Sequence, residues 1–208
     1  VVGSDAAGDA VVALVAGSDV TAQAQAPHAL IDLTKRASTL NFTGVKAQRV
    51  LSGDKVASAI RDYLLIGALL TAAEAVGSTS TCLAGIVDYL KTRKQFGKLI
   101  GSFQALKHPT VDIYVGMEHS RSLVYHASSE IDDGPLSTEA EVACRMAKAK
   151  ASDTIQYAGD RSVQFHGGFG FTWECDSSLF IRRAAWSQQQ FGDAMHHRKR
   201  LAPLLLDA

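Results

Sequence analysis

Long alanine- and leucine-rich segments with helical spacing fill the chain after Gly53 and limit the folds open to it. We predict four helices, at about residues 55–92, 102–132, 138–165 and 176–201. Segments of this length are unusual for isolated globular helices, because a lone helix gains little stability without packing. The sequence therefore predicts a mainly α fold built on an up-and-down four-helix bundle.

Local signals bear on where these helices begin. Pro109 removes a hydrogen bond inside the second segment, so that helix either kinks there or begins near His108. The third helix begins at a capping-box pattern, Thr138-x-x-Glu141. Asp176 is a suitable cap for the fourth helix.

Short apolar runs separated by turn-forming residues precede the predicted helices. Residues 9–16 predict a buried strand, and the alternating residues 40–45 predict another. About fifty residues are too few for a complete β domain of ordinary size. We therefore expect residues 1–51 to be a partial β domain and residues 52–208 to be the helical bundle.

The composition excludes some classes of protein. The chain has 21 basic and 21 acidic side chains, whereas a nucleic-acid binder normally shows a basic face. Three cysteines without a C-x-x-C spacing indicate reduced thiols of a cytoplasmic protein. The longest apolar run, residues 63–73, is shorter than the roughly 20 residues that span a bilayer, so we expect no membrane segment. No signal-like stretch opens the chain, and secretion is not indicated.

Arg93 is the first candidate binding residue. A guanidinium is a planar, permanently charged fork suited to phosphate oxygens, although a cation at a helix end also complements the helix dipole. Phe96 adds an aromatic face close by and Gln104 adds an amide. The presence of Phe96 and Gln104 near Arg93 favours a binding role for Arg93 over a purely structural one.

A glycine-rich turn, Gly167-Gly168-x-Gly170, follows Gln164 and is the second candidate. It follows a helix and lacks a preceding strand, so it is not a dinucleotide-binding strand-turn-helix motif. The turn is either a simple helix stop or a stop whose bare backbone, with Gln164, holds a ribose or diphosphate.

Metal and nucleophile sites are not predicted. His196 and His197 point in different directions around a helix, and His126 with Glu130 fits an intrahelical pair better than a metal site. The sequence has no Glu-x-x-His and no G-x-S-x-G elbow.

Taken together, Arg-x-x-Phe-Gly at residues 93–97, Phe-Gln-Ala at 103–105 and Gln-x-x-Gly-Gly-x-Gly-Phe at 164–171 resemble the C-terminal half of the acyl-CoA dehydrogenase family. Residues 32–36 and 40–45 look like the last strands of that family's middle β domain. The resemblance implies a four-helix bundle at the core of a dimer or tetramer, with FAD lying across a subunit boundary.

The resemblance also assigns roles to the candidate residues. Arg93 would meet the FAD diphosphate of a neighbouring subunit, and Phe96 and Gln104 would line the same arm of the cofactor. Gln164 and Gly168 would hold the adenosine end.

The catalytic residue is unknown. Many family members carry the base glutamate in a Tyr-Glu-Gly-Thr segment, and Phe191 occupies that place here. Some members use a glutamate on the first C-terminal helix, around residues 66–68 in this chain, where no carboxylate stands either. Asp193 and Glu74 are the nearest carboxylates along the sequence, and neither is aligned with a base position.

The sequence of residues 170–174 resembles that of actinobacterial members of the family, some of which assemble from two different chains. Our first hypothesis is an FAD-dependent subunit that desaturates an acyl-CoA within a homo-oligomer or a heterotetramer with a related subunit. A non-catalytic helical scaffold without flavin is the alternative. An acyl-CoA oxidase also stays open.

Overall fold

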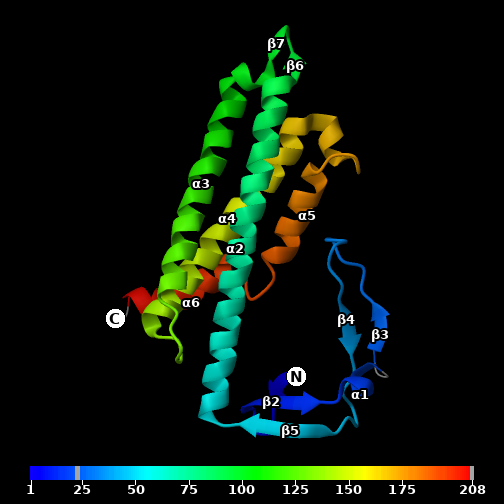
Figure 1. Ribbon diagram of the computed structural model, residues 1–208, viewed down its shortest axis with the longest axis vertical. Helices are drawn as coiled ribbons and strands as arrows, with labels where there is room; N and C mark the ends of the chain where they lie inside the picture. The colour runs from blue at the N-terminus through cyan, green and yellow to red at the C-terminus, as the bar shows by residue number, and fades with distance from the viewer. Residues whose placement is uncertain (22–23, 207–208) are drawn as a thin grey trace. The chain divides into compact units, whose positions relative to one another are not determined.

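The computed structural model describes residues 1–21 and 24–206, which form two compact units (Figure 1). The units are Val1–Leu64 and Leu65–Ala208, so the division between them falls inside the longest helix. The expected domain boundary at residues 51 and 52 stays a prediction.

The first unit contains short strands. They are β1 (Val2–Ser4), β2 (Ala10–Val15), β3 (Ala24–Pro27), β4 (Ser38–Leu40) and β5 (Ala47–Ser52), with the short helix α1 (Gly17–Thr21) after β2. One antiparallel sheet has the order β1-β2-β5, and β3 pairs with β4. The strand expected at residues 9–16 is present as β2, although its side chains are mostly half-buried rather than buried.

The strand expected at residues 40–45 is wrong, because the chain turns after Leu40. The Asn41 carboxamide oxygen accepts the Thr43 backbone N–H at 2.9 Å, which makes a local Asx turn. Gly44 then takes a positive φ of 78°. These turn residues outweigh the apolar–polar alternation. The next strand, β5, begins at Ala47 and pairs with β2.

Helices dominate the second unit. Its elements are α2 (Asp54–Thr92, which begins in the first unit), β6 (Lys94–Gln95), β7 (Lys98–Leu99), η1 (Ile100–Ser102), α3 (Gln104–Ser129), α4 (Thr138–His166), η2 (Gly167–Phe171), α5 (Ser177–Ser187) and α6 (Ala194–Leu206). Helix α4 is central, since it contacts α3, α5 and α6. Its buried alanines, Ala140, Ala143, Ala147 and Ala151, share one core with Leu65 and Leu69 of α2 and Met117 and Val124 of α3. The mainly α fold predicted from the sequence is confirmed.

The start of one helix and the cap of another differ from the predictions. Helix α3 begins at Gln104 with Pro109 inside it, so a start near His108 is wrong. Ser137 rather than Thr138 caps α4, since its Oγ accepts the Ala140 N–H at 3.1 Å.

The predicted fourth helix is two helices. Residues 188–193 separate α5 from α6, and within them Phe191 and Gly192 have φ values of 56° and 96°. Positive φ cannot continue a right-handed helix, so the chain turns there.

Helix α2 has the length and composition of a membrane-crossing helix, and 33% of its most apolar 18-residue window is buried in the structure. Five of its buried residues belong to the core shared with α3 and α4, and three more belong to a second core cluster with residues of the same helices. Core helices of soluble proteins can have the same length and composition, so these properties of α2 are weak evidence for a membrane span. The expectation of no membrane segment stays a prediction.

Candidate functional site

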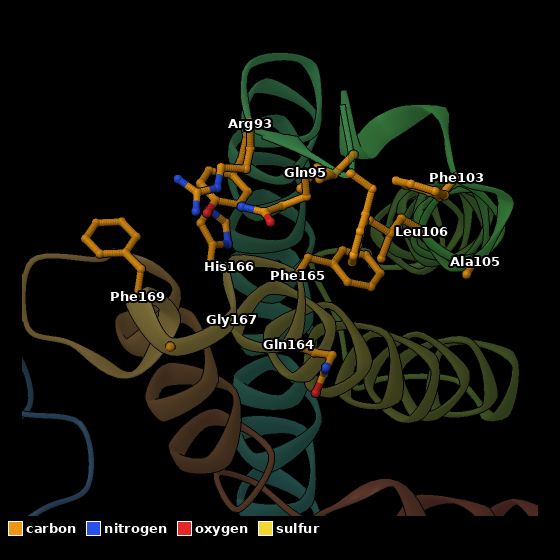
Figure 2. A pocket seen from close by; sticks show the side chains of 14 residues that line it. Arg93, Gln95, Phe103, Ala105, Leu106, Gln164, Phe165, His166, Gly167 and Phe169 are labelled. Carbon is orange, nitrogen blue, oxygen red and sulfur yellow. The ribbon is translucent and has the colours of Figure 1, made fainter. Parts of the chain in front are cut away.

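A cavity of about 750 Å³ lies where the end of α2, the β6–β7 hairpin, the start of α3 and the end of α4 meet (Figure 2). Arg93, Phe96, Gln164 and Gly168 line it, although they are far apart in sequence. Gln104 does not line it and is exposed at the first position of α3. The structure thus brings four of the five candidate residues to one place. Whether they bind a cofactor stays a prediction.

Arg93 holds its position through its backbone. Its N–H donates to the Tyr89 carbonyl oxygen at 2.9 Å and so continues the last turn of α2. Its own carbonyl accepts the Ile100 N–H at 2.9 Å, which closes the base of the β6–β7 hairpin. The guanidinium side chain reaches the cavity from this fixed corner, where its charge can meet a phosphate.

Phe96 sits at the tip of that hairpin in a costly conformation. Phe96 and Gly97 have φ values of 55° and 76°, as a two-residue type I′ turn requires. For a non-glycine residue this region costs about 1–2 kcal/mol. Phe96 is nonetheless 88% exposed, and its ring makes an edge contact with Phe103 at 6.0 Å between centroids. An aromatic face held at such cost beside a cavity is suited to stacking on a planar ligand group.

The three glycines after α4 serve different ends. Gly167 needs its lack of a side chain for a φ of 61°. A Cβ on Gly170 would come within 2.5 Å of the Val163 carbonyl oxygen, so packing requires that glycine. Gly168 has neither constraint, because a Cβ there would meet nothing within 4 Å. Its bare backbone faces open space at the cavity, which is the kind of surface a close-fitting ligand uses.

Two polar side chains that the sequence did not single out also line the cavity, Gln95 and His166. In Figure 2 both lie beside Arg93, whereas the Gln164 amide points away from Arg93. Gln164 and His166 are two apart on a helix, so they project from nearly opposite sides. Choosing between them from the sequence would have required knowing which side of α4 faces the end of α2.

The two positions where a catalytic glutamate is expected lie in a second region, where Phe191 meets α2. The Phe191 ring packs directly on Gly67, since a Cβ built on Gly67 would lie 2.3 Å from Phe191 Cε1. The two places where the resemblance expects a glutamate are therefore neighbours in space, and both are hydrocarbon. Phenylalanine and glycine side chains cannot take a proton at neutral pH.

The carboxylates nearest along the chain are committed elsewhere. Asp193 Oδ1 accepts the His196 N–H at 2.7 Å, as a residue capping the first turn of α6 does. Glu74 forms an ion pair with Arg183. Neither carboxylate is held for proton abstraction in this arrangement.

Buried polar groups hold the loop that carries Phe191. Lys148 Nζ donates to the Gly192 carbonyl at 2.9 Å and to the Ser187 and Gln188 carbonyls at 3.3 Å each. Burial lowers the pKa of Lys148 to about 8, against the opposing effect of Asp193. His197 Nε2 donates to the Phe191 carbonyl at 3.1 Å, and burial lowers its pKa to about 4. His197 is therefore neutral at pH 7.

The cysteines are free and buried, and burial raises the pKa of Cys82 and of Cys144 to about 11. Neutral thiols of this kind are poor nucleophiles. Among residues 1–21 and 24–206, no three His, Cys, Asp or Glu side chains gather where they could hold a metal ion.

Comparison with known proteins agrees with this architecture. The family model described as acyl-CoA dehydrogenase, C-terminal domain, matches residues 57–203. A helical bundle of this type, with that match over most of the chain, defines the class. The chain belongs to the acyl-CoA dehydrogenase family.

One curated relative and two solved structures illustrate the similarity to this family. The acyl-CoA dehydrogenase IpdE2 of Mycolicibacterium smegmatis is 39% identical over 134 residues, which is 64% of this chain and 40% of the relative. The chain therefore spans about two fifths of that relative's length. The ChsE4–ChsE5 complex from Mycobacterium tuberculosis has the same fold, with a TM-score of 0.84 and 23% identity over 100% of this chain and 55% of that chain. A structure described as PigA with FAD and proline has a TM-score of 0.64 and 25% identity, covering 68% of this chain and 36% of that chain.

Proposed function

We propose that this chain is a subunit of an FAD-dependent acyl-CoA dehydrogenase and that its cavity holds the adenosine-diphosphate arm of the flavin. The observation that carries the proposal is the meeting of Arg93, Phe96 and the open backbone of Gly168 at one cavity. A guanidinium, an aromatic face and backbone without a Cβ match a diphosphate, an adenine and a close-lying ribose in turn.

The cavity residues fit that cofactor arm in part. Arg93 would pair with the diphosphate, and Gly168 would let the adenosine end approach the backbone. Gln104 is exposed and lies outside the cavity. It would therefore contact a part of the cofactor that extends beyond the cavity. When bound, the flavin supplies the hydride acceptor for the β-carbon of the thioester. The structure described as PigA with FAD and proline supports FAD as the cofactor.

Proton abstraction is assigned to another chain. Phe191 and Gly67 leave no titratable atom at either expected base position, while Asp193 and Glu74 are engaged in a helix cap and an ion pair. We therefore propose that the subunit works as a heterotetramer with a related subunit that provides the base, because copies of this chain would lack a base at the same two positions. The likeness to the ChsE4–ChsE5 complex supports this arrangement. An acyl-CoA substrate and a cytoplasmic location also stand as proposals.

The test is flavin retention by the assembled protein. The chain is co-expressed with the product of the adjacent gene, and FAD per complex is measured from visible absorbance. Replacing a residue that makes charged hydrogen bonds to a ligand costs about 10- to 100-fold in affinity, so Arg93→Ala should lose most of its FAD. Lys94→Ala is the matched control, because Lys94 is an exposed cation next in sequence that does not line the cavity.

A scaffold without flavin is the second candidate, because the Phe191–Gly67 contact leaves hydrocarbon at both expected base positions. Under that function, Arg93→Ala and Lys94→Ala would behave alike, and the wild-type assembly would carry no flavin. Equal FAD contents in the two variants would therefore refute the flavoprotein proposal.

A further inference from the structure

A second cavity, of about 420 Å³, lies between α2, the end of α4 and the start of α5. Volumes of about 300–1,000 Å³ are usual for sites that bind small molecules. The cavity shares His166 and Phe169 with the one that contains Arg93. Neither Arg93 nor Gly168 lines it. It is therefore a space separate from the site proposed for the flavin.

Two carboxylates at this cavity have no cationic partner. Glu174 and Asp176, both exposed, line it from the turn before α5. Within residues 1–21 and 24–206, neither side chain makes an ion pair or a hydrogen bond. The described residues that line the cavity include no Lys or Arg, and Arg182 on α5 lies over the Trp173 ring, 4.2 Å from its centroid. The negative charge here is left for a cation from outside the chain.

His166 adds a further acceptor. Its Nδ1 lies 2.8 Å from the Ser162 carbonyl oxygen, which can only accept, so Nδ1 carries the proton. Nδ1 also lies 3.0 Å from Ser177 Oγ, and Ser177 Oγ lies 2.8 Å from Ser162 Oγ. These bonds keep the serine hydroxyls within the wall of the cavity. In the neutral ring, Nε2 is then a hydrogen-bond acceptor.

Cys175 is a separate indication of a ligand. It is 5% exposed and lines the cavity, and in the described part of the chain its Sγ has no hydrogen-bond partner. Cys82, which also lines the cavity, instead donates to the Ala158 carbonyl oxygen at 3.5 Å. Buried polar groups usually have a partner, so an unpaired side chain in a cavity wall marks a place where a ligand can be bound.

We propose that this cavity is a binding site for a small organic cation, an ammonium group carried by an aromatic or alkyl body. Glu174, Asp176 and His166 Nε2 accept hydrogen bonds from the ammonium, which has only donors. Phe169 and Phe180, which also line the cavity, cover the body of the ligand, and aromatic faces attract cations within about 6 Å of the ring centre. The two carboxylates repel an anion of the same shape. The site is independent of the flavin function.

Two probes with opposite charges test the site. 2-Phenylethylamine and 3-phenylpropionate carry the same phenylethyl group, one with an ammonium and the other with a carboxylate. Their dissociation constants are measured by NMR titration of the probe signals with the assembled complex. The amine should bind at least about 10-fold more tightly than the acid.

Removing the two carboxylates tests which charges hold the amine. The double variant Glu174→Gln with Asp176→Asn should weaken amine binding by about 10-fold or more and remove the preference over the acid, because charged hydrogen bonds are lost. The matched control is Asp132→Asn with Asp133→Asn, since these two exposed residues line neither cavity. That variant loses the same charge and should bind the amine as wild type does.

Filling the cavity is a second test that leaves the charge unchanged. Gly85 lines the cavity on α2, and a Cβ there meets nothing within 4 Å, so Gly85→Leu should fold and obstruct the amine, with binding at least about 10-fold weaker. Gly77→Leu is the control on the same helix. A Cβ at Gly77 is equally free, but Gly77 lines a different groove, between α2 and α3, so amine binding should not change.

Losses in the Glu174/Asp176 variant and in Gly85→Leu, with both controls unchanged, are the result expected. Equal affinities of wild type for the amine and the acid overturn the inference, as does a lack of amine binding. Equal losses in the two double variants also overturn it, because they show a general effect of charge. A loss in Gly77→Leu as large as in Gly85→Leu overturns it too, because the amine is then not located in this cavity.

Discussion

The Phe191 ring lies against the backbone of Gly67, so closely that a Cβ at Gly67 would approach Phe191 Cε1 to 2.3 Å. Residues from the middle of α2 and from the loop between α5 and α6 therefore fit together only because one of them has no side chain. This contact occupies the place where related dehydrogenases are expected to carry a carboxylate. It makes the two expected base positions a single packing unit.

Gly67→Ala should therefore destabilise the fold. Alanine is favoured over glycine inside a helix by about 1 kcal/mol, but the new methyl group would collide with the ring. Overpacking of this kind costs about 1–3 kcal/mol, so we expect a net loss in the free energy of unfolding. Urea denaturation measures it.

Gly77→Ala is the control on the same helix, because a Cβ at Gly77 meets nothing within 4 Å. That variant should gain up to about 1 kcal/mol. The double variant Gly67→Ala with Phe191→Ala should be less destabilised than the sum of the two single variants. Additive effects would show that the ring and Gly67 do not constrain each other.

Lys148 should be a main support of the loop that carries Phe191. Lys148→Met removes the donor from the carbonyls of Ser187, Gln188 and Gly192 and from Ser152 Oγ, which lies 2.9 Å from Nζ. Buried acceptors left without partners cost about 1–3 kcal/mol, and several are affected together. We expect a loss of about 2–4 kcal/mol in thermal or urea unfolding.

The matched control for this prediction is Lys150→Met, on the same helix but only half-buried. A substitution away from a buried network should change stability by no more than about 0.5 kcal/mol. Equal effects of the two substitutions would contradict a special role for Lys148.

His197 should make the fold sensitive to acid. Burial, its largest cause, lowers its pKa from 6.5 to about 4, so between these pH values the unfolded chain binds more protons than the folded chain. Stability contributed by the neutral ring is therefore present above pH 6.5 and is lost as the pH falls toward 4. The loss should be on the order of 2 kcal/mol.

The variant His197→Gln tests this effect, because glutamine keeps an N–H for the Phe191 carbonyl but does not titrate. Its stability should fall less steeply than that of wild type over this pH range. Parallel curves of unfolding free energy against pH would show that another group causes the acid sensitivity.

Much of the helical fold was predictable because helical spacing is a local property. The helix expected at 138–165 matches α4 within one residue at its end. The break at residues 188–193 was not predictable, because it depends on positive φ values at Phe191 and Gly192. Lys148, 44 residues away along the chain, donates to the Gly192 carbonyl, and His197 donates to the Phe191 carbonyl. Sequence periodicity does not contain such contacts.

The candidate site was predictable to the extent that residue chemistry alone indicates it. Arginine and glycine have distinctive roles, so Arg93 and Gly168 could be chosen, and the structure places both at one cavity. His166 also lines the cavity but could not be chosen, since its place beside Arg93 depends on how α4 packs against the end of α2. The β6–β7 hairpin was also missed, because two-residue strands leave no periodic pattern.

The glycine turn after α4 gives the sharpest separation of folding from binding. Gly170→Ala should lose about 1–3 kcal/mol of stability, because its Cβ would lie 2.5 Å from the Val163 carbonyl oxygen. Gly167→Ala should lose about 1–3 kcal/mol, because its φ of 61° and ψ of −141° lie in a region that alanine rarely adopts. Gly168→Ala should leave stability unchanged or raise it by up to about 1 kcal/mol, since nothing in this chain meets its Cβ.

Flavin binding should show the opposite pattern. A methyl group on Gly168 projects into the space proposed for the adenosine end, so the FAD affinity of the assembled complex should fall by at least about 3-fold while the fold stays intact. Unfolding curves and FAD titrations on the same three preparations provide both measurements. If Gly168→Ala bound FAD as tightly as wild type, the open backbone at residue 168 would have no part in holding the cofactor, and Arg93 would be left as the main support for the site.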